Sequence, residues 1–283
     1  MSSVGIATAP GTPHRRRARS RRSLTHGSAL ALGISVVWLS LLVLIPLAAI
    51  LVSAADLGLA GFWDVVTQPQ TWAALKLTVF ESIAVTLLNV VMGTMLAWVL
   101  VRDRFPGKRV LDLFIDVPFA LPTIVAGLVL LTLYGPKSPI GIHAANTRWA
   151  VFLALAFVTL PFVVRTVQPV LESLERDVEE AAASLGAGRL TTFRRVLLPS
   201  LVPAIAAGAA LAFARAISEY GSLVLLSGNL QYRTEVASVR IYGFNQDGNR
   251  ASASAIAAIL LVVALVVIVV LDILQRRLAR RGD

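Results

Sequence analysis

Two opposite charges lie within an otherwise apolar stretch of the chain. Arg215 and Glu219 are four residues apart, so in a helix they would share one face and could form an ion pair. Charged side chains at membrane depth are costly and are therefore functional candidates. With Ser218, Tyr220 and Ser222 beside it, the pair could gate a pathway. Alternatively, it could be a structural pair whose two charges cancel each other.

Covalent or metal chemistry is hard to build from the remaining residues. The chain has no cysteine, which excludes disulfides, thiolate metal sites and cysteine nucleophiles. His14, His26 and His143 show no ligand spacing. No paired acids or Ser/His/Asp set share a depth, and residues 135–138 are too short for a phosphate-binding GxxxxGKS/T loop. We therefore expect no catalytic residue, no metal, no cofactor and no ATP hydrolysis by this chain alone.

A polar segment at 166–199 concentrates charge in a chain that otherwise avoids it. Its acids come first and its arginines last, an order that suits a helix dipole. Apolar residues at spacings of 3, 4, 4 and 3 predict an amphipathic helix that begins after Pro169. These positions are Leu171, Leu174, Val178, Ala182 and Leu185. Gly186 or Gly188 is expected to end the helix in a left-handed turn.

The same helix has a face of small residues, Ala181, Ala182 and Ala183, flanked by Glu179 and Glu180. Small side chains allow a partner to approach closely, and the acids can pair with basic residues on it. The alternative is a helix that lies on the membrane surface. Anionic headgroups repel an acid-rich helix, so the sequence favours docking of a partner protein.

Membrane helices must position these groups. The chain is 57% hydrophobic and 15% charged, with a mean hydropathy of +0.77. Residues 27–55, 82–101, 117–136 and 251–271 contain no Asp, Glu, Lys or Arg. Each run is about 20 residues or longer, enough for a helix to cross a bilayer, and the alternation of a β-barrel is not visible. We predict an all-α integral membrane protein with six transmembrane helices. They cover roughly 29–54, 79–101, 115–135, 149–165, 200–227 and 251–272.

The distribution of positive charge predicts the orientation. Of the 26 Lys and Arg residues, nineteen lie in 15–22, 102–109, 165–195 and 276–281, all on one side of the predicted topology. Six lie on the other side, and Arg215 lies within a span. The positive-inside rule then places both termini in the cytoplasm. Anionic lipid and topology explain the net charge of +10 without a nucleic-acid partner.

The spacing within the polar segment matches a known pattern. Glu180-Ala181-Ala182 is followed by Gly186, then by Val196 and Leu198-Pro199. This pattern resembles the EAA loop of the permease subunits of ABC importers and departs from it nowhere. The resemblance implies that 166–199 is a cytoplasmic coupling loop on which a separate ATPase subunit docks. The implied coupling residues are Glu179, Glu180, Ala181, Ala182, Gly186, Leu198 and Pro199.

Other stretches are similar to the T-type permease of the sulfate/thiosulfate importer. They are residues 104–109, 116–123, 161–169, 219–222 and 234–236. Molybdate and tungstate permeases share the EAA loop and the Glu-aromatic-Gly segment, so they are the near alternative. Residues 242–250 are more polar than in the sulfate permease pattern. This external loop could contact the binding protein, and the departure leaves the details of that contact open.

The resemblance implies a type I ABC importer permease fold in the cell inner membrane, working by alternating access. Residues 27–56 would form the first transmembrane helix and 74–275 the permease core, between basic cytoplasmic tails at 1–26 and 276–283. The implied partners are a related W-type permease, two copies of an ABC ATPase subunit and an extracytoplasmic sulfate-binding protein.

A sulfate path is better lined by neutral donors than by a carboxylate, which favours a structural role for Arg215 with Glu219. The candidate pathway residues are Arg215, Ser218, Glu219, Tyr220, Ser222 and Thr123. Pro118 and Pro122 should bend the third span, and Asn89 should join helices rather than bind a ligand. An ion-coupled secondary transporter is a different class, and the internal repeats typical of such folds are not visible.

Overall fold

The computed structural model describes residues 26–174 and 176–279, all of whose regular elements are helices. The predicted N-terminal tail up to residue 25, Glu175 and residues 280–283 lie outside the described residues. The chain divides into two units, residues 1–47 and 48–283. The first holds α1 (His26–Leu39), the π-helical η1 (Ser40–Leu44) and the start of α2 (Ile45–Ala55). Leu30–Ala55 is long and apolar enough to span a membrane, as predicted for the first span.

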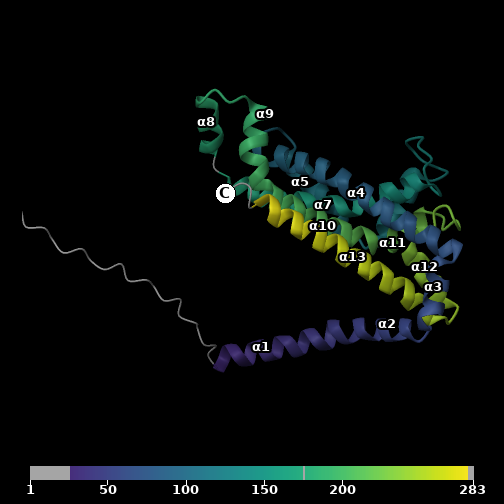
Figure 1. Ribbon diagram of the computed structural model, residues 1–283. Coiled ribbons are helices and arrows are strands. Elements are labelled where there is room, and N and C mark those ends of the chain that lie inside the picture. The colour runs from purple at the N-terminus through teal and green to yellow at the C-terminus, as the bar shows by residue number, and fades with distance from the viewer. Residues whose placement is uncertain (1–25, 175, 280–283) are drawn as a thin grey trace, which may run out of the picture. The chain divides into compact units, whose positions relative to one another are not determined.

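The second unit is built around three long helices that pack on one another, α4 (Pro69–Arg102), α7 (Arg148–Ser173) and α10 (Leu198–Ile217). The C-terminal α13 (Arg250–Ala279) packs against α10 (Figure 1). The shorter elements are α3 (Gly58–Thr67), α5 (Lys108–Ala120), α6 (Thr123–Tyr134), α8 (Arg176–Ser184), α9 (Arg189–Thr192), the π-helical η2 (Phe193–Leu197), α11 (Gly221–Leu226) and α12 (Ala237–Gln246).

The centre of the bundle is apolar with a few internal hydrogen bonds. Val163, Val164 and Val167 of α7 are fully buried among side chains of α4 and α10. The amide of Asn89 on α4 donates to the carbonyl of Ala156 at 3.2 Å and to the hydroxyl of Thr159 at 2.8 Å, both on α7. Asn89 therefore joins two helices, as predicted, and this satisfies a polar side chain that the apolar surroundings could not solvate.

Several predicted spans differ from the observed helices. The second begins ten residues earlier, at Pro69 rather than at residue 79. The third is two helices, α5 and α6, bent by 117°, because Leu121 before Pro122 is extended (φ −86°, ψ 132°). The fourth does not end at Arg165 but continues to Ser173. The fifth ends at Ile217, and α11 is a separate short helix. Among the described residues, five helices are long and apolar enough to span a membrane, or six if the bent pair is one span.

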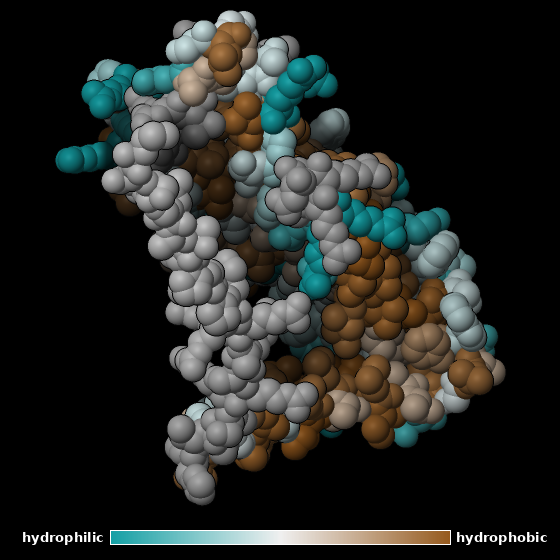
Figure 2. Space-filling view, turned by 60° about the vertical axis from the view of Figure 1, so that its left-hand side comes forward, coloured by the Kyte–Doolittle hydropathy of each residue, from teal (hydrophilic) through white to brown (hydrophobic). Residues whose placement is uncertain are grey.

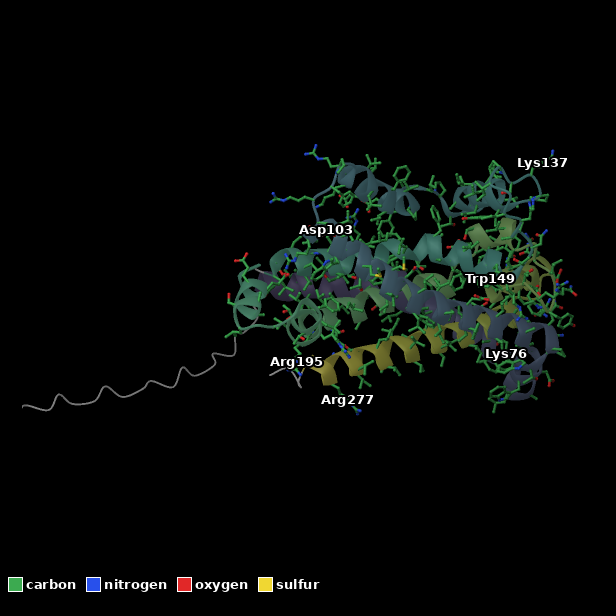
Figure 3. All side chains as sticks on the ribbon, turned by 90° about the horizontal axis from the view of Figure 1, so that it is seen from above. Lys76, Asp103, Lys137, Trp149, Arg195 and Arg277 are labelled. Atoms are coloured by element: carbon green, nitrogen blue, oxygen red, sulfur yellow. The ribbon has the colours of Figure 1, made fainter. Side chains whose placement is uncertain are left out.

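Charged residues gather at the two ends of the second unit. Figure 3 shows Asp103, Arg195 and Arg277 at one end and Lys76 and Lys137 at the other. This separation agrees with the two groups of loops that the charge count assigns to opposite sides of a membrane. Between the ends, many large apolar side chains are exposed, and broad apolar areas are visible in Figure 2. Leu113 (69%), Phe114 (66%) and Val270 (56%) are examples, as expected for a lipid-facing surface.

Helices α6 and α11 approach each other closely because Gly127 has no side chain. A Cβ atom there would lie 2.7 Å from the carbonyl oxygen of Ser222 and 2.8 Å from its Cα. We expect Gly127→Ala to lower the free energy of unfolding by about 1–3 kcal/mol, because it overpacks a backbone contact. Thermal unfolding in detergent measures this change. Gly243→Ala on α12, where no atom lies within 4 Å, is the control and should not be destabilising.

Candidate functional site

The predicted ion pair forms, although its two residues do not share one helix. Arg215 lies in the last turn of α10, and Glu219 follows the end of that helix. Arg215 Nη2 is 2.6 Å from Glu219 Oε2. The Glu219 side chain has no exposed surface, whereas that of Arg215 is 29% exposed. A buried carboxylate needs such a partner, because leaving one charge of a pair uncompensated is strongly destabilising.

The other oxygen of Glu219 organises the start of α11. Oε1 accepts hydrogen bonds from the backbone N–H of Ser222 at 2.8 Å and from its hydroxyl at 2.9 Å. The carbonyl of Glu219 accepts a third bond from the hydroxyl of Ser238 on α12 at 2.6 Å. Glu219 therefore ties together α10, α11 and α12 at one point.

Helix α6 reaches the same point. Thr123, the first residue of α6, packs so closely on Gly221 that its hydroxyl would lie 2.2 Å from a Cβ at that position. Tyr220 stacks at a tilt on Tyr242 of α12, with ring centroids 5.3 Å apart. Thr123, Arg215, Glu219, Tyr220 and Ser222 are thus brought together at the junction of α6, α10, α11 and α12.

Two serine hydroxyls at this junction, those of Ser218 and Ser222, donate hydrogen bonds within the protein. Ser222 donates to Glu219. Ser218 is exposed, and its hydroxyl donates to the carbonyls of Ala214 at 2.9 Å and Arg215 at 3.2 Å. Neither hydroxyl can give its hydrogen to an anion without first losing these bonds.

The polar segment forms a short helix that ends as predicted at Gly186. The N–H of Gly186 (φ +79°) donates to Ala183 at 2.9 Å and the N–H of Ala187 to Ala182 at 3.0 Å. These two bonds are the Schellman motif, in which glycine takes the left-handed position. Helix α8, which carries Glu180, lies with α9 at the end of the second unit where α13 finishes (Figure 1).

The single amphipathic helix predicted from Leu171 onward is wrong. Pro169 lies inside α7, which runs to Ser173, and α8 starts only at Arg176. Leu171 is buried in the core of the bundle, whereas Leu185 is 89% exposed. Leu171 belongs to the buried face of α7, and that helix ends at Ser173 before α8 begins. The regular spacing therefore ran across two helices and did not mark one face.

The predicted coupling residues fall into two groups. Glu180 and Ala181 are exposed, and Ala182 is half-buried on the same helix. Leu198 and Pro199 form the first turn of α10, separated from α8 by α9 and η2. Glu179 differs from both groups, because its Oε1 lies 2.7 Å from Nη2 of Arg102 at the end of α4.

Sequence reasoning missed a cluster of charges around Arg165. This side chain on α7 contacts Oδ1 of Asp112 at 2.8 Å and Oδ2 of Asp116 at 2.7 Å, both on α5, and the amide oxygen of Gln168 at 2.6 Å. The signal was present as two acids four residues apart, on one face of the helix that precedes the bend at Leu121. The cluster fastens α5 to α7 and lets α7 continue past its arginine.

Comparison with known proteins identifies the family. The profile described as binding-protein-dependent transport system inner membrane component matches residues 89–281. The chain belongs to this family. It is 42% identical to a protein of Salmonella typhimurium named sulfate transport system permease protein CysT, over 93% of this chain and 97% of that one. A protein of the same name from Synechococcus elongatus is 46% identical, over 86% of this chain and 90% of that one.

Solved structures of permeases share the fold. A chain of the bacterial alginate ABC transporter, in complex with its alginate-bound periplasmic protein, aligns with a TM-score of 0.74 and 21% identity, covering 89% of this chain and 94% of that one. A chain of the inward-facing methionine transporter MetNI aligns with a TM-score of 0.54 and 19% identity, covering 77% and 99%. The fold is therefore the type I ABC permease fold, and this family member is a multi-span membrane pore subunit.

We expect single changes at the ion pair to be more destabilising than the double change. Glu219→Gln leaves a cation without its partner, and Arg215→Met leaves a buried carboxylate alone, at a cost of about 3–5 kcal/mol. Arg215→Met with Glu219→Gln should recover much of that loss. Thermal unfolding of the unaltered protein, the two single variants and the double variant in detergent completes a double-mutant cycle. Additive losses in the double variant would show that the two side chains do not stabilise each other.

Proposed function

We propose that this chain is a permease subunit of an ATP-driven importer that carries sulfate and thiosulfate into the cytoplasm. The observation that carries the proposal is the 42% identity to a named sulfate permease along 93% of this chain. The same identity makes a molybdate/tungstate permease the weaker alternative. An ion-coupled secondary transporter would belong to a different class from the binding-protein-dependent family.

We also propose the complete assembly, with a related W-type permease, two copies of an ABC ATPase and an extracytoplasmic sulfate-binding protein. In this arrangement both termini are cytoplasmic, and the end of the second unit that holds α8 faces the ATPase. The charge distribution supports this orientation through the positive-inside rule. The family's dependence on a binding protein supports an external receptor.

The ATPase would dock on the exposed side of α8. Glu180 and Ala181 are exposed there, and Leu185 presents an apolar side chain that is 89% exposed directly before the Gly186 turn. An exposed acid on this helix, followed directly after the helix by an exposed leucine, would suit a partner groove that has both basic and apolar side chains. Leu198 and Pro199, at the start of α10, would follow the movement of α8 through α9 and η2.

The oxyanion path would pass the junction of α6, α10, α11 and α12. Arg215 and Glu219 hold this junction together, and we propose that they serve as a structural closure rather than as direct ligands. Ser218, Tyr220, Ser222 and Thr123 can offer neutral donors when the junction opens. Neutral donors suit a dianion that must be released again, because a fixed cation would retain it.

The substrate is tested by competition. Cells that lack this chain and are complemented with it should regain uptake of radiolabelled sulfate, because the permease completes the importer. Excess unlabelled thiosulfate should suppress that uptake, whereas molybdate should compete more weakly. Collapse of ion gradients at constant ATP should leave uptake intact. Strong inhibition by molybdate alone would favour the molybdate alternative, and loss of uptake with the gradients would favour a secondary transporter.

The coupling role of α8 is tested at Gly186. A residue with a Cβ in the left-handed region costs about 1–2 kcal/mol, so Gly186→Ala should misplace the end of α8. We expect ATP-driven uptake to fall while the chain still reaches the membrane, as measured by transport and immunoblotting of the same cells. Gly188→Ala is the matched control, since this position is open and its φ is not positive. Normal uptake by the Gly186→Ala cells would contradict the coupling role.

A further inference from the structure

The coupling helix α8 is attached to the bundle by little more than its two ends. Its contacts within the described residues concentrate on α9, and most of its side chains with a described environment are exposed. Glu179 and Ala182 are less exposed. The Glu179 side chain is only 27% exposed, and one of its oxygens lies 2.7 Å from Arg102 Nη2. A movement of α8 can therefore reach the membrane helices through this ion pair as well as along the chain itself.

Arg102 holds two elements at once. It is the last residue of α4, and its side chain is 10% exposed. The same Nη2 that faces Glu179 donates to the carbonyl oxygen of Leu174 at 3.1 Å. Leu174 is the C-cap of α7, where the last carbonyls have no partner within the helix and a cation is favoured by the helix dipole. The guanidinium thus fastens the end of α7 and the start of α8 to the end of α4.

The N-terminal half of α4, away from Arg102, contacts a segment next to the candidate pathway. The hydroxyl of Thr78 on α4 accepts the backbone N–H of Ala237 at 2.8 Å, and the next residue, Ser238, donates to the carbonyl of Glu219 at 2.6 Å. Helix α4 is continuous for 34 residues, so a displacement of one end moves the other. The chain of contacts runs from α8 through Arg102 and α4 to the Glu219 junction.

We propose that Arg102 is a positioning residue that couples α8 to α4, so that movement of the docked loop is transmitted to the Glu219 junction. The inference rests on the proposed function of 166–199 as the coupling loop. It also divides the two neighbouring acids by role, with Glu179 as an internal anchor and Glu180 as the acid that faces the ATPase.

The test uses the complete transporter, reconstituted with its partner subunits in proteoliposomes, and measures sulfate uptake and ATP hydrolysis in the same vesicles. Arg102→Ala should lower the uptake per ATP hydrolysed by roughly fivefold or more, the size of a typical coupling between sites, while hydrolysis continues. Arg102→Glu should do the same, and the exchange Arg102→Glu with Glu179→Arg should recover part of the loss. Arg104→Ala, an exposed arginine two residues away, should leave the ratio unchanged.

Three outcomes would overturn the proposal. The uptake per ATP could be normal in Arg102→Ala, the charge exchange could be no better than Arg102→Glu alone, or Arg102→Ala could lose the ATPase subunits on purification. The last result would make Arg102 a residue for assembly rather than for transmission.

A second measurement does not depend on the substrate. Because the chain has no cysteine, spin labels can be placed by Ala183→Cys on α8 and Met95→Cys on α4, both exposed positions. In the assembled transporter the distance distribution should be narrow, broader with Arg102→Ala and narrow again with the charge exchange. An unchanged distribution in Arg102→Ala would refute the anchor. Absence of sulfate uptake by the unaltered transporter would instead refute the proposed function and leave this result standing.

Discussion

Pairing of charge next to apolar helices is the constraint on which this structure depends. A bilayer offers little solvation to a charge, so charged groups at or near membrane depth need partners within the protein. Here Arg215 is paired with Glu219, Arg165 with two aspartates of α5, and Arg102 with Glu179. Each pair joins elements that are separated by a break or a loop. The pairs therefore determine which of these elements are held together in this conformation.

The Glu219 pair and the Arg165 cluster differ in burial and in the number of groups that each one holds. The Glu219 side chain is fully buried and also accepts hydrogen bonds from the N–H and the hydroxyl of Ser222 at the start of α11. Its loss would leave these two donors and Arg215 without that partner. The Arg165 cluster is more exposed and has two carboxylates around one cation, which lets one contact break while the other holds. A tightly held junction together with a less buried cluster on α5 would suit the alternation between two states that we expect of a permease.

Regular features of the sequence predicted the helices well, and local breaks decided where the prediction failed. Long apolar runs identified the spans, and Gly186 identified the end of α8, because hydrophobic length and left-handed backbone are local properties. The bend after Leu121 was expected from Pro122, but its angle of 117° depends on the packing of α6 against α11. The break after Leu174 gave no strong signal, since Leu171 and Leu185 fit one helical face although only the first of them is buried.

Spacing could pair Arg215 with Glu219, because they are four residues apart, and could pair Asp272 with Arg276, which meet at 2.9 Å. It could not pair Arg102 with Glu179, because 77 residues separate them and only the packing of α4 beside α7 brings them together. The same limit holds for Arg165 and its aspartates. The EAA pattern predicts the surface on which we propose that the ATPase docks, whereas the contacts proposed to transmit its motion are tertiary. A short motif can therefore suggest a docking surface, and only the folded bundle can suggest a route for transmission.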